Sequence, residues 1–459
     1  MPINRCITLT PLLIVLCTGI LISANATAEN TLTAEQDHTY MLEQLGIKHL
    51  RRGADGDPRS EHAANYDEAN ANGNMGSLPE LLKLQNGTPV TTPEHWWSTR
   101  RPEIMALFDQ EIYGYTPHTL PAVSWEIKNK IATTKANIAV ITHELMGTID
   151  NSTHPAISVS IRLNLTLPAQ QKQPVPVVLQ HSFDPEVLAR LLSRFSPEQI
   201  KSFNGNAIPW DEQIIAKGWG YAELISTSVQ ADSGSGLREG IIGLANKGQP
   251  RSPEEWGTLK AWSWAASEAL NYFEKTPSVD ASKVAIAGHS RFGKTALVTM
   301  AYDQRFAAAY ISSSGEGGAK LWRRNFGEQI GNIAGSGEYH WVAGNFIRYA
   351  GLLTANDLPV DAHQLIALCA PRPVFISSGN NGDQWVDPKG MFLAALHASP
   401  AYVLLGKNPL SGDVFPPVGT GLLDGDIAFK QHSGGHTAGP NWALFLAFFD
   451  KHIQTQANQ

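Results

Sequence analysis

Three residues of this chain could together make a serine hydroxyl reactive. Ser290 lies in the segment VAIAGHSRFGKT, where five small or apolar residues precede His289 and an apolar helical pattern follows the threonine. A serine hydroxyl is a weak nucleophile until a histidine accepts its proton and a carboxylate orients that histidine. His436 and Asp383 lie downstream and could supply these two groups. The chemistry would be transfer of an acyl group from an ester to water.

The turn that carries Ser290, GHSRFGKT, fits two motifs. It satisfies the phosphate-loop pattern G-x-x-x-x-G-K-[ST], whose amides, lysine and hydroxyl hold a nucleotide and its magnesium. It also resembles the nucleophile elbow G-x-S-x-G, although Phe292 stands where the second glycine is usual and the glycine follows at position 293. The context favours the elbow, because more than half of the chain precedes the turn and the next apolar run ends in three serines rather than in an aspartate.

The order of the remaining residues fits an α/β-hydrolase, in which an acid follows a later strand and a histidine lies near the C-terminus. Asp383 follows the strand-like PVFIS, and His436 lies in QHSGGHTAGPNW before the last helical segment. We therefore predict Ser290 as the nucleophile, His436 as the base and Asp383 as the orienting acid. The competitors are His432 and Asp387, although Asp387 precedes a proline and is typical of a helix start.

Arg291 and Lys294 follow the proposed nucleophile and are charged. The backbone N–H of Arg291 is the usual oxyanion donor of an elbow, and its guanidinium could add a charged donor; the alternative is an arginine paired to a surface carboxylate. Lys294 lies one helical turn further on and could reach substrate hydroxyls. No cofactor and no metal are expected, since two glycines between His432 and His436 break the spacing that would align a metal pair.

Alternating strand-like and helical segments must position these residues. They predict an α/β-hydrolase with a mostly parallel central sheet and helices on both faces. The glycine- and serine-rich residues 226–250 are expected to form a surface loop near the site. The expected strands are 138–144, 156–167, 175–180, 221–225, 284–288, 307–311, 373–377, 402–405 and 427–430, and the expected helices are 41–50, 93–114, 252–273, the segment after 295, 388–397 and 442–452.

Residues 1–28 are expected to be a cleaved signal peptide, with Arg5, an apolar core and an A-x-A cleavage site; an uncleaved anchor is the alternative. Residues 29–90 are predicted to be an N-terminal lead-in segment and 91–459 the catalytic domain. Only Cys369 would remain after cleavage, which rules out an intramolecular disulfide and suits a secreted or periplasmic protein of a bacterial envelope. The net charge of -7 argues against a nucleic-acid partner. After cleavage we expect a monomer with no membrane contact.

The segment GHSRFGK resembles the G-x-S-R-x-G-K signature of the glucuronoyl esterases, here of bacterial type. These carbohydrate esterases cut the ester between glucuronate on xylan and lignin alcohols. The resemblance extends through EEWG, WSWAASEALNYFE, SGEGGAKLWRRNFGEQIGNI, LIALCAPRPVFISSGNNGDQWVDP and the late GGH, so it covers about residues 80–455. It implies a 4-O-methyl-glucuronoyl methylesterase activity, with roles for Ser290, His436 and Asp383 in catalysis, Arg291 at the oxyanion, and Lys294, Glu328 and Trp385 at the glucuronate ring.

The sequence departs from the family in two places. Many members carry a glutamate that serves as or assists the acid where this chain has Ser313, so the acid role is left to Asp383, with Glu316 as a candidate auxiliary acid. The segment QHSFDPE also differs from the expected pattern, so the substrate range could differ. The alternatives are an acetyl or feruloyl xylan esterase of the same fold, and a secreted carbohydrate-binding homologue without activity.

Overall fold

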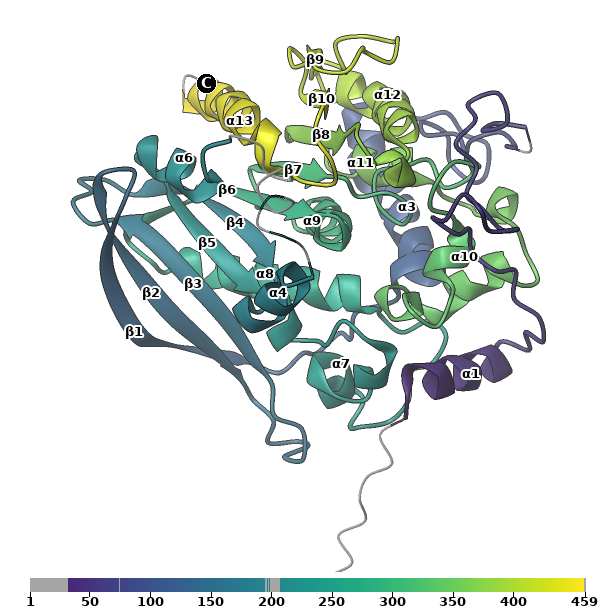
Figure 1. Cartoon of the computed structure of the whole chain (residues 1–459), viewed down its shortest axis with the longest axis horizontal. Coiled ribbons are helices and arrows are strands. Elements are labelled where there is room, and N and C mark those ends of the chain that lie inside the picture. The colour runs from purple at the N-terminus through teal and green to yellow at the C-terminus, as the bar shows by residue number, and fades with distance from the viewer. Residues whose placement is uncertain (1–31, 74, 195, 197, 199–206, 458–459) are drawn as a thin grey trace, which may run out of the picture. The chain divides into compact units, whose positions relative to one another are not determined.

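A single mixed sheet organises the computed structural model, which describes residues 32–459 except 74, 195, 197, 199–206 and 458–459. Figure 1 shows β1 and β2 at one edge of the sheet and β8 with β10 towards the other. In spatial order the ten strands of the described part are β1 (Val123–Lys135), β2 (Ile138–Ile149), β3 (Ser160–Pro168), β5 (Gly220–Ile225), β4 (Val175–Ser182), β6 (Val279–His289), β7 (Ala308–Ser312), β8 (Val374–Gly379), β10 (Ile427–His432) and β9 (Gly421–Leu422).

The strands that carry the proposed site are parallel. The pairs β4–β5, β4–β6, β6–β7, β7–β8 and β8–β10 run parallel, whereas β1, β2, β3 and β9 pair antiparallel to their neighbours. Because β6, β7, β8 and β10 are parallel neighbours, their carboxyl ends meet at one edge of the sheet, where α/β proteins place their ligands. The predicted fold class is confirmed. The strands β1 and β9 were not predicted, since most residues of β1 are exposed and polar and β9 has only two residues.

Helices cover both faces of the sheet. Alternate residues of β6 separate the two cores: Val284 and Ile286 belong to one cluster, and Ala285 and Ala287 to the other. The first cluster includes residues of α3 (Arg101–Phe108), α8 (Thr258–Phe273), α9 (Arg291–Tyr302), α11 (Ala362–Ala367) and α12 (Pro388–Leu404). The second includes residues of α6 (Trp210–Ala216) and α13 (Trp442–Ala457), and Figure 1 shows these two helices on the same side of the strands.

Two predicted elements are corrected. The strand expected at 402–405 is wrong, because α12 continues to Leu404 with Pro400 inside it. Proline usually breaks a helix, but here Ala398, Ala401 and Tyr402 are buried in the core, and this packing offsets the lost hydrogen bond. The helix expected from residue 252 begins instead at Thr258. The side chain of Glu255 does accept the N–H of Ser252, but this closes a turn before the helix.

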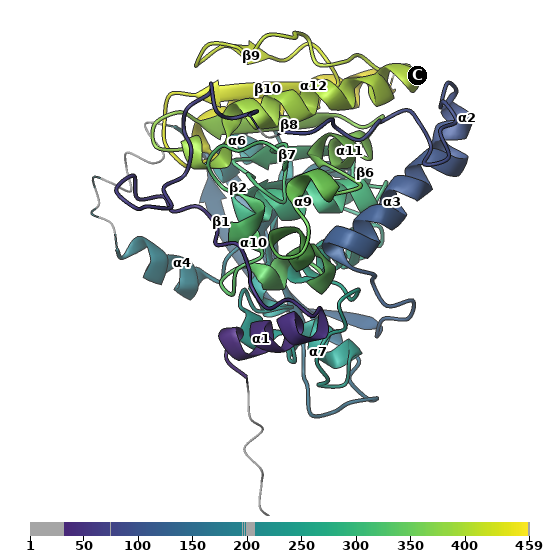
Figure 2. The same ribbon diagram turned by 90° about the vertical axis from the view of Figure 1, so that its right-hand side faces the viewer.

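The segments outside the sheet are mostly helical. α1 (Ala34–Gln44) begins earlier than predicted and has a capping box of Thr33 and Gln36. Residues 93–113 are helical as expected, with two π-helical stretches. Figure 2 shows α1 at one end of the described part, and β9, β10 and α12 at the other. The remaining elements are α2 (Pro93–His95), η1 (Trp96–Arg100), η2 (Asp109–Tyr113), α4 (Pro185–Leu192), η3 (Ser226–Ser228), η4 (Gly234–Gly236), α7 (Gly240–Ala245), α10 (Ile330–Ile333), η5 (Tyr339–Trp341), η6 (Gly344–Ala350), η7 (Ala355–Asp357), η8 (Gln384–Val386) and η9 (Gly439–Asn441).

Two expectations concern the ends of the chain and its cysteines. The proposed signal peptide, with Cys6 and Cys17, lies outside the described residues. Cys369, the one cysteine among the described residues, is buried and free. Within the described ranges, no helix combines the length and the apolar character needed to cross a membrane.

Candidate active site

Ser290 lies on a strained turn between β6 and α9. Its backbone has φ 57° and ψ -128°, a conformation that side chains other than glycine rarely adopt and that is typical of a nucleophile elbow. A Cβ atom at Gly288 would lie 1.9 Å from the carbonyl oxygen of Phe292, and one at Gly293 would lie 2.6 Å from that of Ser312. Both glycines are therefore required by close backbone contacts, and the second contact explains why the glycine is shifted by one residue.

Phe292 occupies the position where the elbow motif usually has glycine. Its ring points into the core, where the ring centroids of Phe183 and Trp262 lie 4.7 and 5.2 Å from its own. The phenylalanine is 4% exposed, so it anchors the first turn of α9 without covering Ser290. The imperfect match to the motif is thus compatible with an exposed serine hydroxyl.

Asp383 and His436, the proposed acid and base, are hydrogen-bonded to each other. Asp383 follows β8, and its Oδ1 atom lies 2.6 Å from Nδ1 of His436. Its other oxygen accepts the backbone N–H of Gly379 at 2.6 Å and the hydroxyl of Ser313 at 2.8 Å. Three donors thus hold a buried carboxylate, which places the ring proton of His436 on Nδ1 and leaves Nε2 free to accept a proton.

His436 lies beside the elbow. Its ring centroid is 4.4 Å from that of His289, the residue before Ser290, and its side chain is 43% exposed, so that a substrate can reach it. Burial, with the charge of His436 as the next cause, holds the pKa of His289 well below its usual value, so His289 is neutral. The competitor His432 is buried, and its two nitrogens contact the carbonyl oxygen of Thr437 and the N–H of Gly434. His432 therefore shapes the loop that carries His436.

Glu316, the candidate auxiliary acid, does not reach the histidine. Its Oε2 atom lies 2.6 Å from Nζ of Lys320, and both side chains are completely buried. Burial acts to raise the pKa of Glu316, and the charge and hydrogen bond of Lys320 act against this rise. In the described part of the chain the structure therefore places Glu316 in an ion pair below the site, and Ser313 fills the position next to the acid with a hydroxyl that donates to Asp383.

Arg291 is the first residue of α9, so its backbone N–H has no partner within the helix and can donate to an oxyanion. Its guanidinium lies 5.0 Å from the ring centroid of Trp341 and pairs with Asp232. Asp232 also accepts hydrogen bonds from Nε2 of His340 at 3.0 Å and Nε1 of Trp341 at 2.7 Å. Burial acts to raise the pKa of Asp232, but these donors and the charge of Arg291 outweigh it and lower the pKa to about 2.

Lys294 is more enclosed than the sequence indicated. It is 4% exposed, and its ammonium group donates to the carbonyl oxygens of Ser314 and Glu316 and to Oε2 of Glu328. These bonds use all three of its N–H groups. The phosphate-loop alternative does not fit this arrangement, because the lysine is committed to backbone carbonyls and a carboxylate. Lys294 instead fixes the orientation of Glu328.

Glu328 and Trp385, for which the resemblance implies contacts with the glucuronate ring, are joined through their backbones. The backbone N–H of Glu328 donates to the carbonyl oxygen of Trp385 at 2.8 Å, and the indole is half-buried. A further acid, Glu338, was missed by the sequence analysis. Its Oε2 atom is buried without a partner among the described residues, and burial together with the charge of Glu328 raises its pKa. The sequence placed residues 226–250 near the site without singling out Asp232, and no pattern pointed to Glu338, because both acids lie in irregular segments.

The amino-acid sequence is similar to a known family and to known esterases. The sequence profile of a family described as glucuronyl esterase, fungi, matches residues 251–406. The chain is 34% identical over 411 residues to carbohydrate esterase MZ0003 from an unknown prokaryotic organism, covering 85% of this chain and 92% of the relative. It is 26% identical to 4-O-methyl-glucuronoyl methylesterase 1 from Wolfiporia cocos, covering 74% of this chain and 75% of that protein.

Solved structures agree with these sequence matches. A CE15 glucuronoyl esterase from Teredinibacter turnerae T7901 is similar with a TM-score of 0.87 and 50% identity, covering 92% of this chain and all of that one. A glucuronoyl esterase from Solibacter usitatus is similar with a TM-score of 0.71 and 31% identity, covering 84% of this chain and all of that one.

Proposed function

This chain belongs to the glucuronoyl esterase family, and from that premise we propose that it hydrolyses esters of glucuronate or 4-O-methylglucuronate. In glucuronoxylan these uronates are side chains, and the alcohol would be one of lignin. The observation that carries the proposal is the hydrogen bond between His436 and Asp383 beside a serine held on a strained elbow. This arrangement can activate Ser290 for attack on an ester carbonyl.

The first half of the reaction forms an acyl-enzyme. The oxygen of Ser290 attacks the ester carbonyl carbon while Nε2 of His436 accepts the hydroxyl proton. The negative charge that develops on the carbonyl oxygen is stabilised by the backbone N–H and the guanidinium of Arg291. Asp383 stabilises the imidazolium. When the tetrahedral intermediate collapses, the bond to the alcohol breaks and His436 returns the proton to the leaving oxygen.

The second half frees the enzyme. Water attacks the acyl carbon, His436 accepts a proton from that water, and the bond to Ser290 breaks with return of the proton to the serine oxygen. The products are the alcohol and the free uronate. Since Arg291 binds the charge that develops during attack rather than the neutral ester, its contribution falls mainly on kcat.

A group of polar side chains near the elbow is the evidence for a sugar on the acyl side of the ester. Lys294 lies one helical turn beyond Ser290 on α9, and its ammonium group donates to Oε2 of Glu328. The charges of Glu328 and Lys294 both act on the pKa of Glu338. The half-buried indole of Trp385 adds an aromatic face of the kind on which sugar rings pack. Carboxylates accept hydrogen bonds from sugar hydroxyls, so this group suits a hydroxylated acyl portion.

Three esters distinguish the proposed substrate from those of other xylan esterases. We expect hydrolysis of benzyl glucuronate and little hydrolysis of methyl ferulate or acetylated xylan, since only benzyl glucuronate carries its carbonyl on the sugar. The Ser290→Ala variant is the control and should lose the activity. Preference for the acetyl or feruloyl ester would overturn the substrate assignment, and absence of covalent labelling of Ser290 by a fluorophosphonate would overturn the serine mechanism.

We also propose that residues 1–28 direct the chain to the periplasm or outside the cell and are then removed. The apolar core and the A-x-A site in the sequence support this. We propose that the mature enzyme acts as a monomer without metal or cofactor. The mass of the mature chain from an envelope fraction and its elution from a size-exclusion column test these proposals.

A further inference from the structure

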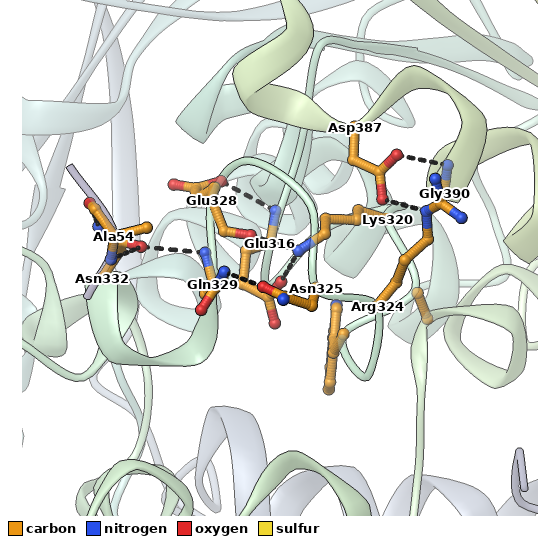
Figure 3. Close-up of polar contacts among 12 residues, drawn as sticks. Ala54, Glu316, Lys320, Arg324, Asn325, Glu328, Gln329, Asn332, Asp387 and Gly390 are labelled. Carbon is orange, nitrogen blue, oxygen red and sulfur yellow. Dashed lines mark hydrogen bonds and ion pairs between the residues drawn. The ribbon is translucent and has the colours of Figure 1, made fainter. Parts of the chain in front are cut away.

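An ion pair without a role in the acyl transfer lies below the uronate side of the site. Glu316 and Lys320 are both completely buried, and their charged atoms are 2.6 Å apart. Oε1 of Glu316 has no hydrogen-bond partner among the residues that the structure describes. Figure 3 shows Lys320 directed towards Glu316, with Glu328 next to this pair.

The pair contacts Glu328 at two points. Nζ of Lys320 donates to the backbone carbonyl of Glu328, and the backbone N–H of Glu316 donates to Oε2 of the Glu328 carboxylate at 2.9 Å. The carbonyl oxygen of Glu316 also accepts a bond from Lys294, which donates to the same Oε2 atom. Both the main chain and the carboxylate of Glu328 are therefore fixed by groups that belong to or contact the pair.

The same segment is joined to the loop that carries the acid. The backbone N–H of Glu328 bonds to the carbonyl of Trp385, and Nε of Arg324 lies 2.8 Å from Oδ2 of Asp387 (Figure 3). A Cβ atom at Gly327 would lie 2.2 Å from the carbonyl oxygen of Trp385, which shows how closely the two segments approach. Glu328 is thus held both by Lys294, which follows the elbow, and by the segment that carries Asp383 and Trp385.

A buried ion pair is a poor device for stability alone. Removing two charges from water costs about as much free energy as their attraction returns. Replacing a buried ion pair with apolar residues of similar size therefore often leaves a protein equally stable or more stable. What such a pair does provide is fixed geometry, as contacts behind a binding group orient that group. We propose that Glu316 and Lys320 are a positioning pair that holds the Glu328 carboxylate towards the sugar ring of the substrate, a role that rests on the proposed function.

The test compares an ester that carries the sugar with one that lacks it. In Lys320→Met we expect the KM for benzyl glucuronate to rise about tenfold, because the Glu328 carboxylate loses its alignment. We expect kcat/KM for p-nitrophenyl acetate to change less than about twofold, since that ester has no ring for Glu328 to contact. Lys217→Met is the matched control, because it removes a lysine from a half-exposed ion pair with Asp450, and it should change neither value.

A second comparison asks whether Lys320 acts through Glu328. In a Glu328→Gln background, Lys320→Met should raise the KM by about twofold or less, since the contact that it positions is already altered. An equal rise in both backgrounds, or an equal loss with both esters, would overturn the proposal. If Lys320→Met does not fold, the neutral pair Glu316→Gln with Lys320→Met is measured in the same way, and failure of both variants to fold would assign the pair to stability and refute positioning.

The proposed function has its own signature in these assays. If it is wrong, the unaltered chain cleaves p-nitrophenyl acetate but not benzyl glucuronate. Failure of the positioning role instead leaves the unaltered chain active on both esters and is seen only when the variants are compared.

Discussion

The Asp383→Asn substitution tests which carboxylate orients His436, the proposed base. Three donors converge on this side chain: Nδ1 of His436, the N–H of Gly379 and the hydroxyl of Ser313. A carboxylate accepts on both oxygens, whereas an amide has one accepting oxygen and one donating nitrogen. The amide oxygen will face the fixed N–H of Gly379, because the opposite orientation would leave two donors facing each other in a buried site, at a cost of about 1–3 kcal/mol.

That orientation turns the amide nitrogen towards Nδ1 of His436. The ring must then accept at Nδ1 and carry its proton on Nε2, so it cannot take the proton of Ser290. Loss of the correct tautomer lowers kcat by about 10⁴-fold in a serine triad, which corresponds to about 5 kcal/mol of transition-state stabilisation. We expect a loss of this size with both benzyl glucuronate and p-nitrophenyl acetate. Steady-state kinetics on protein with an unchanged melting temperature is the measurement.

Two companion variants make the result decisive. Ser313→Ala removes one donor to Asp383 and leaves the bond to His436, so we expect a loss of about five- to tenfold. For p-nitrophenyl acetate, the kcat of Glu316→Gln should exceed that of Asp383→Asn by at least about 100-fold. The reason is that the Glu316 carboxylate bonds to Lys320 rather than to His436. If Asp383→Asn kept more than about a tenth of the kcat, another carboxylate would orient His436 and our account of the acid would be wrong.

Three further predictions concern charge. Arg291→Ala should lower kcat by about 10²- to 10³-fold with little change in KM, and a change confined to KM would refute the oxyanion role. Asp232→Asn should lower kcat about tenfold for both esters, because the Arg291 guanidinium loses its partner, and an unchanged kcat would contradict this. Burial lowers the pKa of His363 from 6.5 to about 4, so the unfolded chain binds more protons between these values and the stability present above pH 6.5 is lost as the pH falls towards 4. His363→Gln should remove about 3 kcal/mol of this dependence in urea unfolding at pH 7 and pH 4, and an unaltered slope would refute it.

Local patterns were sufficient to locate the elbow. The uncharged run before His289 predicted a strand buried on both faces, and the glycines at 288 and 293 predicted a tight turn. The proposed acid and base were chosen by their order after this turn, and the structure brings Asp383 and His436 within hydrogen-bonding distance. The exposed strand β1 was missed although Val123, Trp125 and Ile127 alternate with polar residues, because the alternation is short and most of the strand is exposed.

Contacts between distant segments were beyond what the pattern could show. Residues 226–250 are not the expected surface loop, because they form η3, η4 and α7 and pack into the core. Their fold brings Asp232 to Arg291, and Lys294 is enclosed by residues 20 or more positions away. The Glu316 carboxylate was a candidate acid by its neighbours in the sequence, but its direction depends on Lys320. Side-chain direction in an irregular segment is set by such tertiary contacts, and the sequence has no period that reports it.

The close approach of Gly327 to Trp385 has a consequence for loop grafting between related esterases. A segment spanning residues 313–329 that is transplanted without residues 383–390 would bring a foreign surface against the Trp385 carbonyl, and any side chain at position 327 would clash there. The two segments should therefore be exchanged together as a single cassette. Chimaeras that carry only one of them are expected to misplace Glu328 even when every individual residue of the segment is correct.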